Sequence, residues 1–174
     1  EDGENFHRQE QPLLEGKCAL ACRGVEDPRV IRINDKFIMT YAAYDGDIAR
    51  LNIATSRDLK NWKKQGAAFR HKTSHDQETW LKNGRLQTIA RPPEWTKSGA
   101  MFPELINGKY WMLYGANRIW LTQSEDCQHW PDPVRPWLEA REEKDQFDNL
   151  FVETGPPPLK TEKGWLVIYH GINR

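Results

Sequence analysis

Short apolar and aromatic segments, each introduced by a tight turn, recur along the chain. Three of them begin at a turn dipeptide and continue into a run that ends in tyrosine: Asn34-Asp35 with 36–41, Asn107-Gly108 with 109–114, and Lys163-Gly164 with 165–169. A turn dipeptide followed by β-branched and aromatic residues is typical of a β-hairpin. The pattern therefore predicts three hairpins, each with an aromatic-rich strand.

A second motif, Ser-x-Asp-x3-Trp, occurs at 56–62 and again at 124–130. In both places it follows a short predicted strand, at 50–55 and 119–123. Unrelated hairpins in a β-sandwich are the alternative, but two motifs repeated in the same order favour a β-propeller, in which each sheet is one repeat. A helical period is almost absent, and 136–148 is expected to be a charged loop with a turn or two of helix. The prediction is a single all-β propeller domain over 1–174, about three blades long.

Composition narrows the possible partners. The chain has 174 residues, with 25 Lys+Arg against 25 Asp+Glu, so its formal net charge is zero. Without a basic excess, neither nucleic acid nor an anionic membrane is expected as the main partner. No apolar run approaches the length of a membrane-spanning helix, and no signal peptide is visible. The three cysteines, Cys18, Cys22 and Cys127, suggest neither a disulfide scaffold nor a zinc site, so no metal is expected.

The segment Gly24-Val25-Glu26-Asp27-Pro28-Arg29 carries the clearest candidate chemistry. Two adjacent carboxylates precede a proline, which fixes its own φ and is expected to hold Asp27 in an extended conformation. The Asp27 carboxylate is then presented at the mouth of a strand, as a catalytic acid or a sugar-binding group. An ordinary surface turn is the alternative, because Asp-Pro is a common turn dipeptide.

Several motifs together resemble glycoside hydrolase family 130, the β-mannoside phosphorylases and β-1,2-mannosidases. They are Gly-Val-Glu-Asp-Pro-Arg, Ser-Arg-Asp-Leu-Lys-Asn-Trp, Met-Phe-Pro-Glu-Leu-Ile-Asn-Gly-Lys-Tyr, Gly-Pro-Pro-Pro-Leu-Lys-Thr and Gly-Trp-Leu-Val-Ile-Tyr-His-Gly, in order from 24 to 171. The resemblance implies a five-bladed β-propeller, of which this chain corresponds to the middle, without the first and closing blades. It also implies an oligosaccharide substrate and no cofactor.

In the resembled family the aspartate of Glu-Asp-Pro-Arg is the general acid, which implies this role for Asp27. It passes its proton to the glycosidic oxygen through a hydroxyl of the bound mannose. Arg29 would orient the site and bind substrate, although a structural ion pair explains it equally well.

The nucleophile decides between two reactions. A phosphorylase needs cations that hold phosphate as co-substrate, whereas an inverting hydrolase needs a carboxylate to deprotonate water, with the two carboxyl groups roughly 6.5–9.5 Å apart. The chain has Tyr114-Gly115 where phosphorylases carry His-Arg, and Glu153 near a position where they carry lysine. This favours hydrolysis with Glu153 as general base and Glu104 as the second candidate. The alternatives are a surface position for Glu153, sugar binding by Glu104, and phosphate binding by Lys64.

Further substrate-binding candidates come from their places in the motifs. They are the strand-end pair Tyr44 and Asp45, then Lys97, Asp148 and His170, the last implied by the resemblance to face the catalytic centre. The predicted function is an inverting β-mannosidase acting on β-1,2-linked manno-oligosaccharides. A phosphorylase releasing mannose 1-phosphate and a non-catalytic carbohydrate-binding propeller remain the alternatives.

Overall fold

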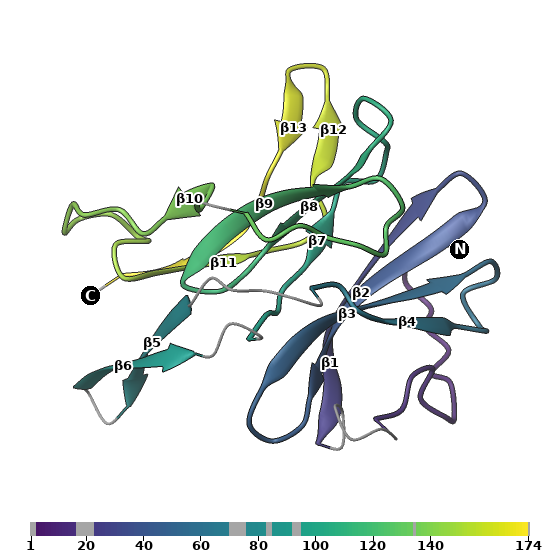
Figure 1. Cartoon of the computed structure of the whole chain (residues 1–174), viewed down its shortest axis with the longest axis horizontal. Helices are drawn as coiled ribbons and strands as arrows, with labels where there is room; N and C mark the ends of the chain where they lie inside the picture. Colours follow the sequence, from purple (N-terminus) through teal and green to yellow (C-terminus); the bar gives the residue numbers. More distant parts are fainter. Residues whose placement is uncertain are drawn as a thin grey trace.

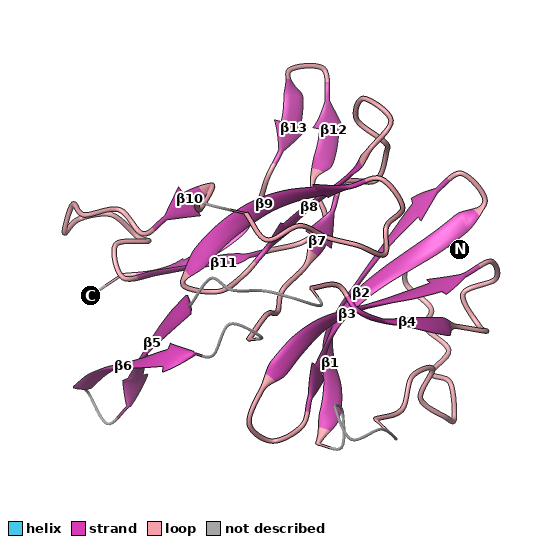
Figure 2. Cartoon of the chain, viewed as in Figure 1, coloured by secondary structure: helices cyan, strands magenta, loops and turns pink. Residues whose placement is uncertain are grey.

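The protein is all-β. The computed structural model describes residues 3–16, 23–69, 76–82, 85–91, 95–133 and 135–173, with backbone only for 76–82 and 85–91. The described residues form fourteen strands and no helix (Figure 2). Accordingly, this part of the chain contains no helix able to cross a membrane. Cys18 and Cys22 lie outside the described residues, as does the side chain of Trp80.

The first sheet is a four-stranded antiparallel meander. Its order follows the sequence: β1 (Gly24–Ile33), β2 (Lys36–Tyr44), β3 (Ala49–Ser56) and β4 (Lys63–Ala67). The register of β1 against β2 shifts between Glu26 and Arg29, which marks a β-bulge in the Asp-Pro segment.

The second sheet repeats this arrangement (Figure 1). Its order is β10-β9-β8-β7, built from β7 (Ala100–Met101), β8 (Tyr110–Tyr114), β9 (Arg118–Ser124) and β10 (Leu138–Glu139). Three antiparallel pairs complete the described strands. They are β5 (Asp76–Lys82) with β6 (Arg85–Arg91), β11 (Phe151–Thr154) with β14 (Tyr169–Ile172), and β12 (Leu159–Thr161) with β13 (Gly164–Leu166).

Apolar packing joins the sheets. The largest group of buried side chains comes from both four-stranded sheets and includes Leu51, Phe69, Met112 and Tyr114. The rings of Phe69 and Tyr114 lie 4.4 Å apart. A second group joins the second sheet to Val152 of β11. Burial of these faces fixes the position of β1, β7 and β11 relative to one another.

The predicted turns are present. Asn34 has a positive φ, as do both Asn107 and Gly108, which is the conformation that two-residue hairpin turns require. The structure corrects two expectations. The run 165–169 is not one strand, because β13 ends at Leu166 and β14 begins at Tyr169. The segment 136–148 contains the short strand β10 and turns, but no helix.

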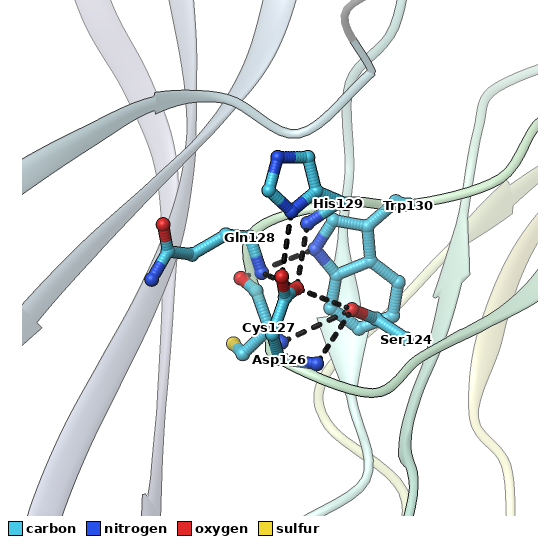
Figure 3. A network of polar contacts seen from close by, with 6 residues as sticks. All are labelled: Ser124, Asp126, Cys127, Gln128, His129 and Trp130. Atoms are coloured by element: carbon cyan, nitrogen blue, oxygen red, sulfur yellow. Dashed lines mark hydrogen bonds and ion pairs between the residues drawn. The ribbon is translucent and has the colours of Figure 1, made fainter.

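The two Ser-x-Asp-x3-Trp motifs form the same turn. In the second copy, Asp126 accepts hydrogen bonds from the backbone amides of Gln128 and His129, and Ser124 accepts one from Cys127 (Figure 3). Asp58 and Ser56 make the equivalent bonds in the first copy. Each tryptophan ring N–H donates to the carbonyl of the residue three positions earlier. The sequence repeat is therefore a structural repeat, at the same corner of both four-stranded sheets.

The described strands form separate open sheets, and no closed ring is seen among them. The all-β prediction is confirmed, whereas the number of blades stays a prediction.

Candidate active site

A chain of backbone hydrogen bonds brings the three sheets together at one end. Thr96 N donates to Ala49 O at the start of β3, Gly115 N donates to Lys97 O, and Thr154 N donates to Gly115 O. The Asp-Pro segment of β1 closes on the same region through Arg29. Residues distant in sequence therefore meet where β1, β11 and the segment before β7 converge.

Asp27 stands in this region in an unusual conformation. Its φ is 52°, in the left-handed region, so the expectation of an extended Asp27 was wrong. The cause is the bulge, which inserts extra backbone into β1, and Asp is one of the residues that tolerate this conformation. Its carboxylate is exposed. Strained non-glycine residues of this kind are often found at functional sites.

Arg29 connects the Asp27 bulge to the end of β11 through hydrogen bonds. Its Nε donates to Gly155 O at 2.7 Å, one terminal nitrogen donates to Thr154 O at 2.9 Å, and the other donates to Asp27 O at 3.2 Å. Burial lowers the pKa of the guanidinium from its ordinary value, and the nearby carboxylates of Asp27 and Glu153 oppose that shift. Arg29 therefore connects the Asp27 segment to the end of β11 through backbone carbonyls, and its predicted role in orienting the site and binding substrate stays a prediction.

Glu153 lies on β11, next to Thr154 and Gly155, whose carbonyls accept hydrogen bonds from Arg29. Its Oε1 accepts a hydrogen bond from Ser98 Oγ at 2.6 Å and contacts Lys97 Nζ at 3.2 Å. The side chains of Lys97 and Glu153 are 23% and 19% exposed, so solvent still reaches this pair. Glu153 is thus not an isolated surface glutamate.

His170 is placed beside Glu153 by strand pairing. The two residues are direct partners in the antiparallel ladder of β11 and β14. Side chains of directly opposed residues lie on the same face of a sheet. We call the six residues that meet here the charged cluster: Asp27, Arg29, Lys97, Ser98, Glu153 and His170.

Tyr44 and Asp45 lie at the same end of the first sheet, where Tyr44 pairs with Gly24. Their polar atoms shape the loop between β2 and β3. Tyr44 donates its hydroxyl hydrogen to Gly46 O, while Asp45 accepts from the amides of Asp47 and Ile48. The hydrogen bonds from the Ile48 amide, then from Arg50 and the Asp47 amide, lower the pKa of Asp45. Their predicted contact with sugar stays a prediction.

Three other candidates lie outside the charged cluster. Glu104 follows β7, at the end opposite Ser98, where it is 49% exposed and forms an ion pair with Lys160. Lys64 is on β4, the outermost strand of the first sheet, and donates to Glu15 O. Asp148 is fully buried.

The contacts of Asp148 are structural. Arg141 Nε and Tyr169 Oη both donate to its carboxylate, at 2.6 Å each. Burial by itself raises the pKa of Asp148, but these two hydrogen bonds outweigh it and lower the pKa. The pair with Arg141 closes the 141–148 segment, and the hydrogen bond from Tyr169 ties that segment to β14. Sequence reasoning placed Asp148 near Glu153 in the chain but had no signal for its burial.

Ser98 is the cluster residue that the sequence did not reveal. It is fully buried, and its backbone has a positive φ of 55°. Its neighbour Lys97 was a candidate, but nothing in Lys97-Ser98-Gly99 indicates a serine turned toward a carboxylate 55 residues away. In the described part of the chain, His, Cys, Asp and Glu side chains form no group of three suited to a metal ion.

Comparison with known proteins agrees with this picture. The family model of glycoside hydrolase family 130, described as β-1,4-mannooligosaccharide phosphorylase, matches residues 1–174. The chain belongs to glycoside hydrolase family 130. A 1,2-β-oligomannan phosphorylase from Thermoanaerobacter sp. (strain X514) is 31% identical over 99% of this chain and 51% of its own length. This family 130 chain spans about half the length of the curated relatives it matches.

Two similar solved structures carry descriptions that name different activities, phosphorolysis in one and hydrolysis in the other. The β-1,2-mannobiose phosphorylase of Listeria innocua, in complex with β-1,2-mannobiose, has a TM-score of 0.77 at 30% identity. It is covered over 43% of its length and 99% of this chain. Another structure, reported with the statement that the GH130 family contains hydrolases targeting β-1,2 mannosidic linkages in Candida mannan, has a TM-score of 0.73 at 30% identity. The match covers 98% of this chain and 49% of that one.

Proposed function

We propose that the intact protein is an inverting β-mannosidase that hydrolyses β-1,2-linked manno-oligosaccharides on a five-bladed propeller. The observation that carries the proposal is the place of Glu153. Its carboxylate lies in the charged cluster with Asp27, and Arg29 connects the backbones that bear the two groups. Two carboxyl groups facing one site are what an inverting glycosidase needs.

The roles follow from the chemistry of inversion. Glu153 takes a proton from water, whose oxygen attacks the anomeric carbon of the mannosyl unit. The bond from that carbon to the glycosidic oxygen breaks, and the leaving oxygen receives a proton that originates from Asp27. One water is consumed, and each carboxyl group has exchanged one proton. The solvent exposure of Asp27 suits an acid that must be reprotonated after each turnover.

The repeated sheets support the propeller part of the proposal. Both four-stranded sheets are meanders whose third and fourth strands are joined through the same Ser-x-Asp-x3-Trp corner, and β11 with β14 begins a third sheet. Radial repetition of such sheets is the propeller architecture.

Phosphorolysis is the second candidate. It is favoured by two cations in the charged cluster, Arg29 and Lys97, because a phosphate nucleophile needs positive charge beside the sugar. The names of relatives at about 30% identity also favour it. Lys64, suggested as a phosphate ligand from the sequence, lies three strands from β1.

Product analysis distinguishes the two reactions. The intact protein is incubated with β-1,2-mannobiose, with and without inorganic phosphate. Hydrolysis gives free mannose as the sole product in both conditions. Mannose 1-phosphate formed only when phosphate is present would overturn the hydrolase proposal, and turnover of neither kind would favour a binding role.

A further inference from the structure

The segment 96–99 is anchored on both sides of Ser98. Lys97 O accepts a hydrogen bond from Gly115 N, and Gly99 O accepts one from Thr40 Oγ1 at 2.6 Å. Gly99 also packs so closely that a Cβ there would lie 2.8 Å from a methyl of Leu51. The backbone on either side of Ser98 therefore has little freedom, and the left-handed conformation of Ser98 is imposed by its surroundings.

This conformation aims the hydroxyl at Glu153. Ser98 is fully buried, and its Oγ donates to Glu153 Oε1 at 2.6 Å. Lys97 Nζ contacts the same oxygen. Among the described residues, no hydrogen-bond or ion-pair partner meets Oε2. One carboxylate oxygen is thus held by the protein, and the other remains available.

We propose that Ser98 is a positioning residue, which holds Glu153 Oε1 and leaves Oε2 as the oxygen that takes the proton from water. The inference rests on the proposed function, in which Glu153 is the general base. The hydroxyl fixes the direction of the carboxylate by donating a hydrogen bond to one of its two oxygens. The left-handed backbone is the means by which a serine adjacent to Lys97 reaches across to β11.

Other titratable groups lie in the same cluster as Glu153. They are Asp27 and Arg29 of β1, Lys97 before β7, and His170 on β14. The test must therefore compare variants that leave all four unchanged.

Ser98→Ala and Ser98→Gly in the intact protein make a matched pair. Both remove the hydroxyl, but glycine also relieves the left-handed backbone strain. For both variants we expect kcat to fall roughly tenfold with KM nearly unchanged, because the carboxylate that activates water is no longer held in one direction. The two should differ in thermal stability only. Thr122→Val is the control, because Thr122 lies on the second sheet, outside the charged cluster. This substitution also removes a buried hydroxyl, which donates to Pro131 O.

Each outcome decides the proposal. An equal fall of kcat at nearly unchanged KM in both variants, absent in Thr122→Val, supports the positioning role. A kcat that stays at the wild-type value in both variants, while wild-type protein still releases mannose without phosphate, overturns this role and leaves the hydrolase proposal intact. Release of mannose 1-phosphate by wild-type protein overturns both, because Glu153 then takes no proton from water.

Discussion

At the scale of single residues, the charged cluster depends on contacts between side chains and backbone. Arg29 donates hydrogen bonds to the carbonyls of Asp27, Thr154 and Gly155. A guanidinium presents several donors in a rigid fork, which lysine cannot reproduce. One side chain thereby connects the backbone segments that carry the two candidate catalytic carboxylates.

Asp27→Asn and Glu153→Gln in the intact protein should each lower kcat by roughly 10²–10⁴-fold, the usual contribution of a general acid or base. Neither amide can supply or accept the proton. Activity on β-1,2-mannobiose measures the effect, and circular dichroism checks that the fold is retained. Glu104→Gln is the matched control, because Glu104 is exposed and paired with Lys160 outside the cluster. An equal loss in Glu104→Gln would contradict the assignment of Glu153.

At the scale of elements, the repeated corner turn shows how one local motif shapes two sheets. The serine and aspartate side chains satisfy backbone amides that the tight turn leaves unpaired, and a non-glycine residue adopts positive φ in each copy, Leu59 in one and Cys127 in the other. The copies differ in the side chain that contacts the aspartate carboxylate. Asn61 donates to Asp58 in the first, and His129 contacts Asp126 at 2.6 Å in the second.

Asp126→Asn and Asp58→Asn should lower the melting temperature at pH 7. The pKa of Asp126 is lowered by His129, through its side chain and its amide, and by the amide of Gln128. A carboxyl whose pKa falls on folding stabilises the protein above its unfolded pKa of about 3.9, and this contribution is lost as pH falls toward the folded value.

Melting curves recorded from pH 7 down to pH 3 check this expectation. The gap between wild type and each variant should narrow as pH falls. Asp35→Asn serves as control, since Asp35 is 78% exposed and lies at the edge of ion-pair distance from Arg57. A gap that persists unchanged at pH 3 would contradict the role given to the charged carboxylates.

At the scale of the whole molecule, the apolar contact between the two four-stranded sheets holds the site together. Leu51 is 1% exposed, and its methyl groups lie against Gly99, next to Ser98. The backbone amide of Leu51 also donates a hydrogen bond to Thr96 Oγ1, in the segment that leads to Lys97. Packing between the sheets and the geometry of the cluster are therefore linked through residues 96–99.

Leu51→Ala should lower the free energy of unfolding by about 2–5 kcal/mol, because it leaves a cavity at this contact. Leu105→Ala, at a position 39% exposed, should cost well under about 1 kcal/mol. Urea denaturation measures both. Equal destabilisation by the two substitutions would show that the contact between the sheets does not carry the stability given to it here.

The sequence alone was sufficient for the local features. The turns at Asn34-Asp35 and Asn107-Gly108, the strands that follow them and the two Ser-x-Asp-x3-Trp corners depend on residues within a few positions of one another. Family membership also followed from motifs, whereas the catalytic roles of Asp27 and Glu153 stay predictions. Local backbone preference and side-chain-to-backbone hydrogen bonds act over short sequence distances, so a pattern can reveal them.

Only the tertiary structure decided which polar residues meet. Arg29 reaches carbonyls 125 and 126 residues away, and Ser98 reaches Glu153 across 55 residues. The same packing removes Asp148 from solvent and turns Glu104 to the far end of β7. The left-handed conformation of Asp27 likewise comes from a bulge against β2, which overrides the preference set by Pro28. Such contacts depend on how whole sheets pack, and no short stretch of sequence encodes that packing.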